Sequence, residues 1–456
     1  MKCFLVFWGL CVAVTANAAA TADQIAKAFM EKNKVPGLAY VILQNGAIVG
    51  RGALGVSDLK SKEPITLSSV FPIASLSKPF VAFGVLSLVE KGQLKLDEPV
   101  GKYLPDIPDD WKPIKIIRLL DHSSGIPDQF NSGKFPVYNT ERLTPDELIK
   151  RLATLPLNFK PGDKFQYSNG NYVLLAKVIE KVAGMPHEQY LTDKIFGPLG
   201  MKNTKALVPE DLAAAVHGYC LTKENPEPAT FNPSWCFGNG ALGSSVLDLA
   251  KLDTALYTQK ILKTSTLSFI TTPQPLNDGT LAPYAMGWVV SKRRGSRVID
   301  HTGRVGGWQS YFGRFADQSL TVIVLSNNRD VNLDTLAADL AGTVALALSL
   351  SPIRDDYPDL TKSHQEFVQT ILEGKVDVER LSEGMKNDYY SKERWKGMSE
   401  MLAKPGKISA FQPVERKMDG ERYMSRYRID QGVTSWNVTF WCDSEGIVTG
   451  FMLISA

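Results

Sequence analysis

The sequence is poor in the residues that mark several common kinds of binding site. Its 456 residues include only five cysteines and five histidines, and neither a C-x-x-C nor an H-E-x-x-H motif occurs. Because metal sites usually need such ligands at close spacing, we predict no metal. Lysine and arginine (51) nearly balance aspartate and glutamate (48), which leaves a net charge of +3. Nothing in this balance calls for a nucleic acid or an acidic membrane surface as partner.

Long apolar runs are also scarce, and the one that stands out lies at the N-terminus. Lys2 precedes an apolar stretch at positions 4–14, and the small residues at 16–18 fit the usual cleavage spacing. The stretch is too short for a bilayer-spanning anchor, so residues 1–18 are predicted to be a signal peptide. Its removal would leave no transmembrane segment and a secreted or periplasmic protein. The alternative is an uncleaved N-terminal anchor.

Three cysteines would remain after removal of the signal, namely Cys220, Cys236 and Cys442. In an oxidising compartment, Cys220 and Cys236 could form a disulfide, whose short loop would contribute up to about 3 kcal/mol in the entropy model. Three buried free thiols are the alternative, and the sequence alone does not separate the two.

The chain length favours two or three domains. Near the N-terminus, two alternating apolar runs meet at Asn45-Gly46, which is the strongest short signal for a β-hairpin. Further short strands are expected between residues 284 and 326, and a closing helix at 333–350. Residues 19–350 are therefore predicted to form one α/β (α+β) domain whose sheet takes strands from both ends of the segment.

A second, smaller domain is expected after it. Pro352, Pro358 and three aspartates indicate a linker, assigned to residues 351–362. Helical patterns near 363–372 and 391–402 precede four short runs separated by turns. Residues 363–456 are thus predicted to form a small α+β domain with a four-stranded meander, of unknown role.

Ser75 and Lys78 form an S-x-x-K pair at the start of an apolar helical segment. Positions i and i+3 share a helix face, so the ammonium of Lys78 can lie against the hydroxyl of Ser75. Serine needs a neighbouring base to become a nucleophile, and a desolvated lysine can lose its proton near neutral pH. A position in the first helical turn would add N–H groups that stabilise an oxyanion. Alone, the tetrapeptide is a common chance match.

Two further motifs stand at a distance, Tyr167-x-Asn169 and His301-Thr302-Gly303. Tyr167, if held between cations, could exchange a proton with the serine and then with a leaving group. Asn169 offers a donor and an acceptor for a substrate amide. Taken singly, Tyr167 is more simply a core residue and His301 a structural one. The set is what favours a catalytic role.

The three motifs, in this order, resemble those of serine β-lactamases and penicillin-binding proteins. The Y-x-N form resembles the branch that contains class C β-lactamases, DD-carboxypeptidases, D-aminopeptidases and β-lactamase-fold esterases. The resemblance covers roughly residues 22 to 350 and includes FPIASLSKPF, LLDHSSGIP, KPGDKFQYSN, FGPLGM and HTGRVGGW. It implies an antiparallel sheet flanked by helices, with an inserted helical lobe and the site between them.

The resemblance also implies roles for particular residues. The expected catalytic residues are Ser75, Lys78 and Tyr167. The N–H groups of Ser75 and Arg304 would form the oxyanion hole. The expected substrate-binding residues are Asn169, His301, Thr302, Gly303 and Arg304.

One position departs from the β-lactamase pattern. Most β-lactamases have lysine where His301 stands, and histidine is mostly neutral at pH 7. This favours peptidase or esterase activity, although Arg304 could restore a positive charge.

We expect a secreted serine hydrolase that forms an acyl-enzyme on Ser75 and cleaves an ester or a D-amino-acid peptide or amide bond. Its substrate would be a small molecule or peptide, and no metal or organic cofactor is expected. The alternatives are a class C-like β-lactamase and a penicillin-binding sensor with little turnover.

Overall fold

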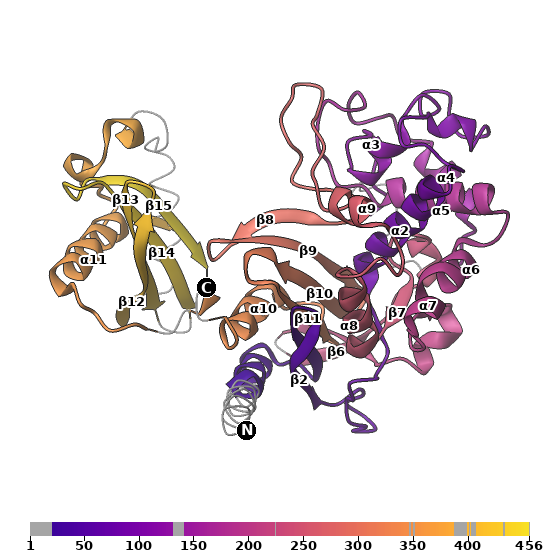
Figure 1. Cartoon of the computed structure of the whole chain (residues 1–456). Helices are drawn as coiled ribbons and strands as arrows, with labels where there is room; N and C mark the ends of the chain where they lie inside the picture. Colours follow the sequence, from indigo (N-terminus) through magenta and orange to yellow (C-terminus); the bar gives the residue numbers. More distant parts are fainter. Residues whose placement is uncertain are drawn as a thin grey trace, which may run out of the picture. The chain divides into compact units, whose positions relative to one another are not determined.

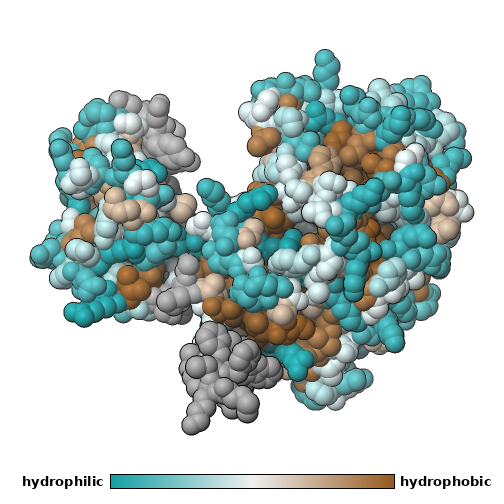
Figure 2. All heavy atoms as spheres, viewed as in Figure 1, coloured by the Kyte–Doolittle hydropathy of each residue, from teal (hydrophilic) through white to brown (hydrophobic). Residues whose placement is uncertain are grey.

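The computed structural model describes residues 21–130, 141–223, 225–345, 348–349, 352–386, 399–400, 402, 407–431 and 434–455. The chain divides into two compact units, Met1–Ala345 and Leu346–Ala456 (Figure 1). The predicted signal peptide lies outside the described residues. In the parts that are described, no helix is both long and apolar enough to cross a membrane. Figure 2 shows hydrophilic side chains over much of the visible face.

A six-stranded antiparallel sheet forms the centre of the first unit, in the order β2-β1-β11-β10-β9-β8. Its strands are β1 (Gly37–Gln44), β2 (Ala47–Gly55), β8 (Val289–Arg293), β9 (Ser296–Val305), β10 (Trp308–Phe315) and β11 (Leu320–Ser326). The predicted hairpin is confirmed, because Asn45 and Gly46 take the left-handed φ values of 53° and 76° that a tight Asn-Gly turn requires. The sheet does combine strands from both ends of the unit.

Two elements differ from the sequence prediction. The strand expected from residue 284 begins only at Val289, because Gly287 adopts a left-handed φ of 85° that interrupts the extended backbone. The closing helix expected at 333–350 is α10 (Leu333–Gly342) and ends eight positions earlier. At its end, the Thr343 hydroxyl donates to the Leu340 carbonyl at 2.7 Å, which competes with continued helical bonding.

Helices cover both faces of this sheet (Figure 1). On one face, Ile299 of β9 and Phe312 of β10 enter the main apolar core, which also receives Leu249 of α8 (Val246–Ala255). On the other face, α10 packs against β10 and β11. The side chains alternate between the two faces, as expected for a strand covered on both sides.

A helical lobe is inserted between β2 and β8. Its helices are α2 (Ser77–Glu90), α3 (Ile116–Leu120), α4 (Pro145–Leu152), α5 (Asn169–Ala183), α6 (His187–Leu191), α7 (Gly197–Leu199) and α9 (Thr264–Phe269). Short strands accompany them, namely β3 (Phe71–Pro72), β4 (Lys205–Ala206), β5 (Gly218–Thr222), β6 (Asn225–Ala229) and β7 (Leu242–Ser244). Helix α2 packs against α5 and is buried on nearly all sides, which explains why it is apolar all round.

The second unit contains a four-stranded antiparallel meander, as predicted. Its strands are β12 (Ala410–Asp419), β13 (Arg422–Gln431), β14 (Thr434–Cys442) and β15 (Val448–Ser455). Phe367 and Ile371 of α11 (Pro358–Leu372) share an apolar core with Val438 and Phe440 of β14. Helix α11 begins inside the segment predicted as linker, because Pro358 is well suited to a first helical position. The helix predicted at 391–402 lies mostly outside the described residues.

Candidate active site

Ser75 lies in a 3₁₀ turn, Ala74–Leu76, directly before α2 and not in the first turn of α2 as predicted. Ala74 has a φ of 48°, a left-handed conformation that is costly for alanine. Ser75 is half-buried, whereas residues 71–74 and 76–80 on either side are buried. The turn, which we call the Ser75 turn, therefore presents one hydroxyl from an otherwise closed segment.

Lys78 is buried and directs its ammonium at three oxygens. Its Nζ lies 3.0 Å from Ser75 Oγ, 2.7 Å from Asn169 Oδ1 and 2.8 Å from the carbonyl oxygen of Asn239. Burial lowers the pKa of Lys78 to about 7, and the negative charge of Asp128 partly opposes this shift. At neutral pH a large fraction of Lys78 is therefore an uncharged amine beside the Ser75 hydroxyl.

Asn169 is held from both ends of its amide. Its Oδ1 accepts from Lys78, while its Nδ2 and its backbone N–H donate to Asp128 Oδ2 at 2.7 and 2.6 Å. One lone pair of Oδ1 and one N–H of Nδ2 are thus engaged, and the substrate-binding role predicted for Asn169 stays a prediction. The geometry makes Asn169 a positioning residue for Lys78, and Asp128 a positioning residue for Asn169.

Tyr167 stands beside the lysine with its ring centroid 4.8 Å from Lys78 Nζ. Burial raises the pKa of Tyr167, and a hydrogen bond with Ser75 partly opposes the shift. Of the neighbouring basic side chains, only Lys78 can supply a positive charge at neutral pH, because burial lowers the pKa of both imidazoles, His122 and His301. Tyr167 is therefore a neutral phenol that can donate a proton. His122 ties the Tyr167 segment to its loop, since its Nδ1 accepts from the Ser168 N–H at 3.2 Å.

His301 has both ring nitrogens engaged. Nδ1 lies 2.6 Å from the Thr302 carbonyl oxygen, which can only accept, so Nδ1 donates. Nε2 then accepts from the Tyr284 hydroxyl at 2.9 Å. Burial lowers the pKa of His301 to about 3, so the ring is neutral. It lies 6.1 Å from the Tyr167 ring, centroid to centroid, and its hydrogen bonds go to other groups.

Gly303 allows β9 to pass close to the Ser75 turn. A Cβ at this position would lie 2.1 Å from the Ile73 carbonyl oxygen and 2.3 Å from Ser310 Oγ. Strand β8 pairs with β9 only as far as Asp300, so the following residues of β9 form an edge that contacts the turn. The exposed side chains of Thr302 and Arg304 extend from this edge, and Arg304 Nη2 pairs with Asp330 Oδ1 at 3.3 Å.

The predicted site residues thus fall into two groups. Ser75, Lys78, Tyr167 and Asn169 converge, while residues 301–304 lie on the neighbouring strand, with His301 turned toward Tyr284. Sequence reasoning missed Asp128, Asn239 and Tyr284. Asp128 looks like an ordinary turn acid, and Asn239 contributes a backbone carbonyl that any residue would supply, so neither position carried a usable signal.

The remaining expectations concern cysteine and metal. Cys220, Cys236 and Cys442 are free thiols, so the disulfide alternative is wrong for this structure. Burial raises the pKa of the Cys236 thiol to about 12, although the charge of Lys78 opposes the shift. Within the described ranges, one group of side chains could hold a metal ion, Glu180 of α5 with His187 and Glu188 of α6, and it includes none of the predicted site residues.

A family model described as beta-lactamase matches residues 22–346. The chain belongs to the beta-lactamase family. Within this beta-lactamase family, it is 30% identical over 306 residues to penicillin-binding protein 4* of Bacillus subtilis (strain 168), a match that covers 63% of this chain and 67% of the relative. It is 28% identical over 299 residues to the D-aminopeptidase of Brucella anthropi, covering 64% of this chain and 56% of that enzyme.

The fold of the chain is also similar to that of solved structures. The structure of the octameric penicillin-binding protein homologue from Pyrococcus abyssi matches with a TM-score of 0.62 at 22% identity, covering 95% of this chain and 99% of that one. The resemblance predicted from three short motifs is confirmed. The protein is a beta-lactamase-family serine hydrolase of mixed helix and antiparallel-sheet fold, with an additional small C-terminal sheet domain.

Proposed function

We propose that this hydrolase forms an acyl-enzyme on Ser75, with Lys78 as the base, and cleaves D-amino-acid amides or peptides, or esters. The observation that carries the proposal is the 3.0 Å contact between Lys78 Nζ and Ser75 Oγ, together with a Lys78 pKa of about 7. A base of this pKa is poised to accept a proton at neutral pH.

In the first step, uncharged Lys78 accepts the Ser75 proton as Oγ forms a bond to the substrate carbonyl carbon. The carbonyl electrons move onto its oxygen, which the N–H groups of Ser75 and Arg304 would stabilise. The tetrahedral adduct then collapses and the bond to the leaving nitrogen or oxygen breaks. Tyr167, a neutral phenol, donates a proton to the leaving group and recovers one from the Lys78 ammonium.

In the second step, water replaces the leaving group. The again uncharged Lys78, acting through Tyr167, takes a proton from water as its oxygen attacks the acyl carbon. The bond to Ser75 Oγ breaks and the serine regains its proton. Asn169 and Asp128 hold Lys78 in place throughout.

The environment of His301 supports a substrate without a carboxylate at that position. A buried neutral ring with both nitrogens engaged supplies no charge to attract an anion. The D-aminopeptidase relative acts on D-amino-acid substrates, and its similarity supports that class here. Efficient hydrolysis of carboxylate-bearing β-lactams is accordingly the less favoured activity.

We also propose that the protein is exported, as the N-terminal pattern at residues 1–18 suggests. N-terminal sequencing of the mature protein from a culture should begin at Ala19. A mature chain that keeps residues 1–18 would contradict cleavage.

The test of the nucleophile is Ser75→Ala. This variant should lose covalent labelling by a fluorescent phosphonate and all turnover of D-alanine p-nitroanilide and of short-chain p-nitrophenyl esters. Ser69→Ala, whose side chain bonds only to nearby Thr66, is the matched control and should behave as wild type. Labelling of Ser75→Ala at the wild-type rate would exclude Ser75 as nucleophile. An acylation burst without steady-state turnover of any substrate, a cephalosporin included, would indicate a sensor.

A further inference from the structure

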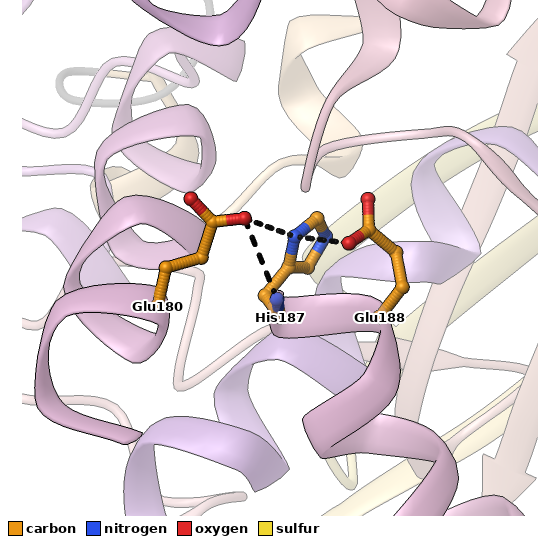
Figure 3. Close-up of side chains that lie close together, drawn as sticks. All are labelled: Glu180, His187 and Glu188. Carbon is orange, nitrogen blue, oxygen red and sulfur yellow. Dashed lines mark hydrogen bonds and ion pairs between the residues drawn. The ribbon is translucent and has the colours of Figure 1, made fainter. Parts of the chain in front are cut away.

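Three potential metal ligands converge in the helical lobe. Glu180 comes from α5, while His187 and Glu188 begin α6, and the three side chains point toward one another (Figure 3). His187 Nδ1 lies 3.6 Å from Glu180 Oε1 and 3.2 Å from Glu188 Oε2. One ligand atom from each of the three residues lies within 4.8 Å of the other two.

The imidazole is the second, independent observation. The His187 side chain is only 4% exposed, and Phe237 holds the ring edge-to-face at a centroid distance of 4.5 Å. Among the described residues, its Nδ1 has no hydrogen-bond partner of acceptable geometry, although two carboxylate oxygens face it. When protonated, the ring forms ion pairs with both carboxylates; when deprotonated, its Nδ1 lone pair is directed between them and can coordinate an ion.

The spacing fits a transition metal. Bonds of about 2.0–2.1 Å in a tetrahedral site place neighbouring ligand atoms about 3.4 Å apart. The two separations of 3.2 and 3.6 Å from His187 Nδ1 lie on either side of that value. One imidazole nitrogen and two carboxylate oxygens suit zinc and similar ions better than they suit the all-oxygen preference of calcium or magnesium.

The surroundings also allow an ion to enter and stay. The side chains of Glu180 and Glu188 are 24% and 35% exposed, so the carboxylate side of the cluster opens to solvent. Lys177 Nζ lies 3.3 Å from Glu180 Oε2, which leaves Oε1 directed at the imidazole. Ligating carboxylates are commonly oriented by such outer hydrogen-bonding partners.

We propose that Glu180, His187 and Glu188 bind a divalent transition-metal ion of the zinc class, with water in the remaining position. The ion ties the end of α5 to the start of α6 and is structural, because the cluster includes none of the predicted site residues. It revises the expectation of no metal. The three ligands lie on either side of the turn at residues 184–186, and their spacing in the sequence matches no common metal motif. They come together only because α5 and α6 pack against each other.

The experiment uses the full chain without a polyhistidine tag, treated with chelator and titrated with Co²⁺ and Zn²⁺. Wild type should bind one equivalent, with visible Co²⁺ absorption typical of a four-coordinate site that Zn²⁺ abolishes. The unfolding midpoint should rise with Zn²⁺ but not with Ca²⁺ or Mg²⁺. His187→Gln and Glu180→Gln should each weaken Zn²⁺ binding at least 30-fold.

His217→Gln is the matched control. His217 Nδ1 also lies near a carboxylate, 3.5 Å from Asp58 Oδ1, but is exposed and has no place in the cluster, so its loss should leave binding unchanged. If folded wild type binds no Co²⁺ or Zn²⁺, or responds only to Ca²⁺ or Mg²⁺, the proposal is wrong. Full-strength binding by a folded His187→Gln variant would overturn it as well.

Discussion

At the scale of single residues, burial is what suits Lys78 to the role of base in the proposed mechanism, because it lowers the pKa of the lysine to about 7. Its ammonium loses water on entering the core, and the three oxygens around it only partly replace that solvation. The negative charge of Asp128 opposes this effect and raises the pKa of Lys78. These two opposing effects on the pKa of Lys78 should therefore set the pH range in which the enzyme is active.

The pH dependence of turnover should reflect this balance. Below the Lys78 pKa the amine is protonated and cannot accept the Ser75 proton, so kcat/KM should fall about tenfold for each pH unit below about 7. His301, with a pKa near 3, should not titrate between pH 5 and 9. The measurement is kcat/KM for an uncharged ester across that range. A flat profile would contradict Lys78 as the base.

Asp128→Asn should shift that profile. Removing the negative charge lowers the Lys78 pKa further, so the midpoint of the rising limb should move to lower pH by about one unit. The limiting kcat should also fall, because Asn169 loses a charged acceptor. Asp163→Asn removes an exposed carboxylate bound to Asn277 and should leave the midpoint unchanged. An unmoved midpoint in Asp128→Asn would show that Asp128 does not tune the lysine.

The spacing within one turn predicted the contact of Ser75 with Lys78, and the family resemblance predicted that Tyr167 and Asn169 join them. The sequence did not predict the hydrogen-bond partners of each side chain. The bonds of Asn169 to Lys78 and Asp128 were not predicted, and its substrate-binding role stays a prediction. Such choices depend on side chains more than 40 positions away, which spacing cannot reveal.

At the scale of elements, the site depends on how closely β9 approaches the Ser75 turn. Gly303 permits an approach that any side chain would prevent, and the end of β8 leaves that part of β9 unpaired on one side.

The sequence predicted the hairpin β1–β2 from its turn. It misplaced the start of β8 and the end of α10, because a local backbone bend and a threonine bond decided those boundaries.

Gly303→Ala should move β9 away from the Ser75 turn. The added methyl group would lie 2.1 Å from a backbone oxygen that cannot rotate away, so β9 or the turn must move. A displacement near 1 Å should lower kcat/KM on the order of 100-fold. Gly50→Ala is the control, since the nearest atoms to its methyl group would be side-chain atoms of Ile42 at 3.2–3.5 Å and not a backbone oxygen. Wild-type turnover in Gly303→Ala would mean that this close approach is not needed.

At the scale of the whole molecule, all the residues of the candidate site lie in the first unit, and the second unit has its own apolar core. Composition and turn spacing were enough to predict the meander of the second unit. They said nothing of its role, because a packed sheet of this size serves many purposes.

A chain of residues 19–350 should therefore keep its turnover. We expect kcat/KM for a neutral ester within about threefold of the full chain, with a lower unfolding midpoint if the second unit stabilises the first. Circular dichroism should establish that the truncated chain is folded. A folded but inactive truncation would show that the second unit completes the active site.

The pairing of β1 with β11 has a consequence for how the protein is made. The Gly37 N–H donates to Asn327 Oδ1, 290 positions later, and β1 is buried along nearly its whole length. β1 can pair with β2 at once, but at a synthesis rate of about 10 residues per second it waits about 30 s for β11, its second partner. Contacts this distant in sequence also slow folding itself. The central sheet can therefore be completed only after nearly all of the first unit has been synthesised.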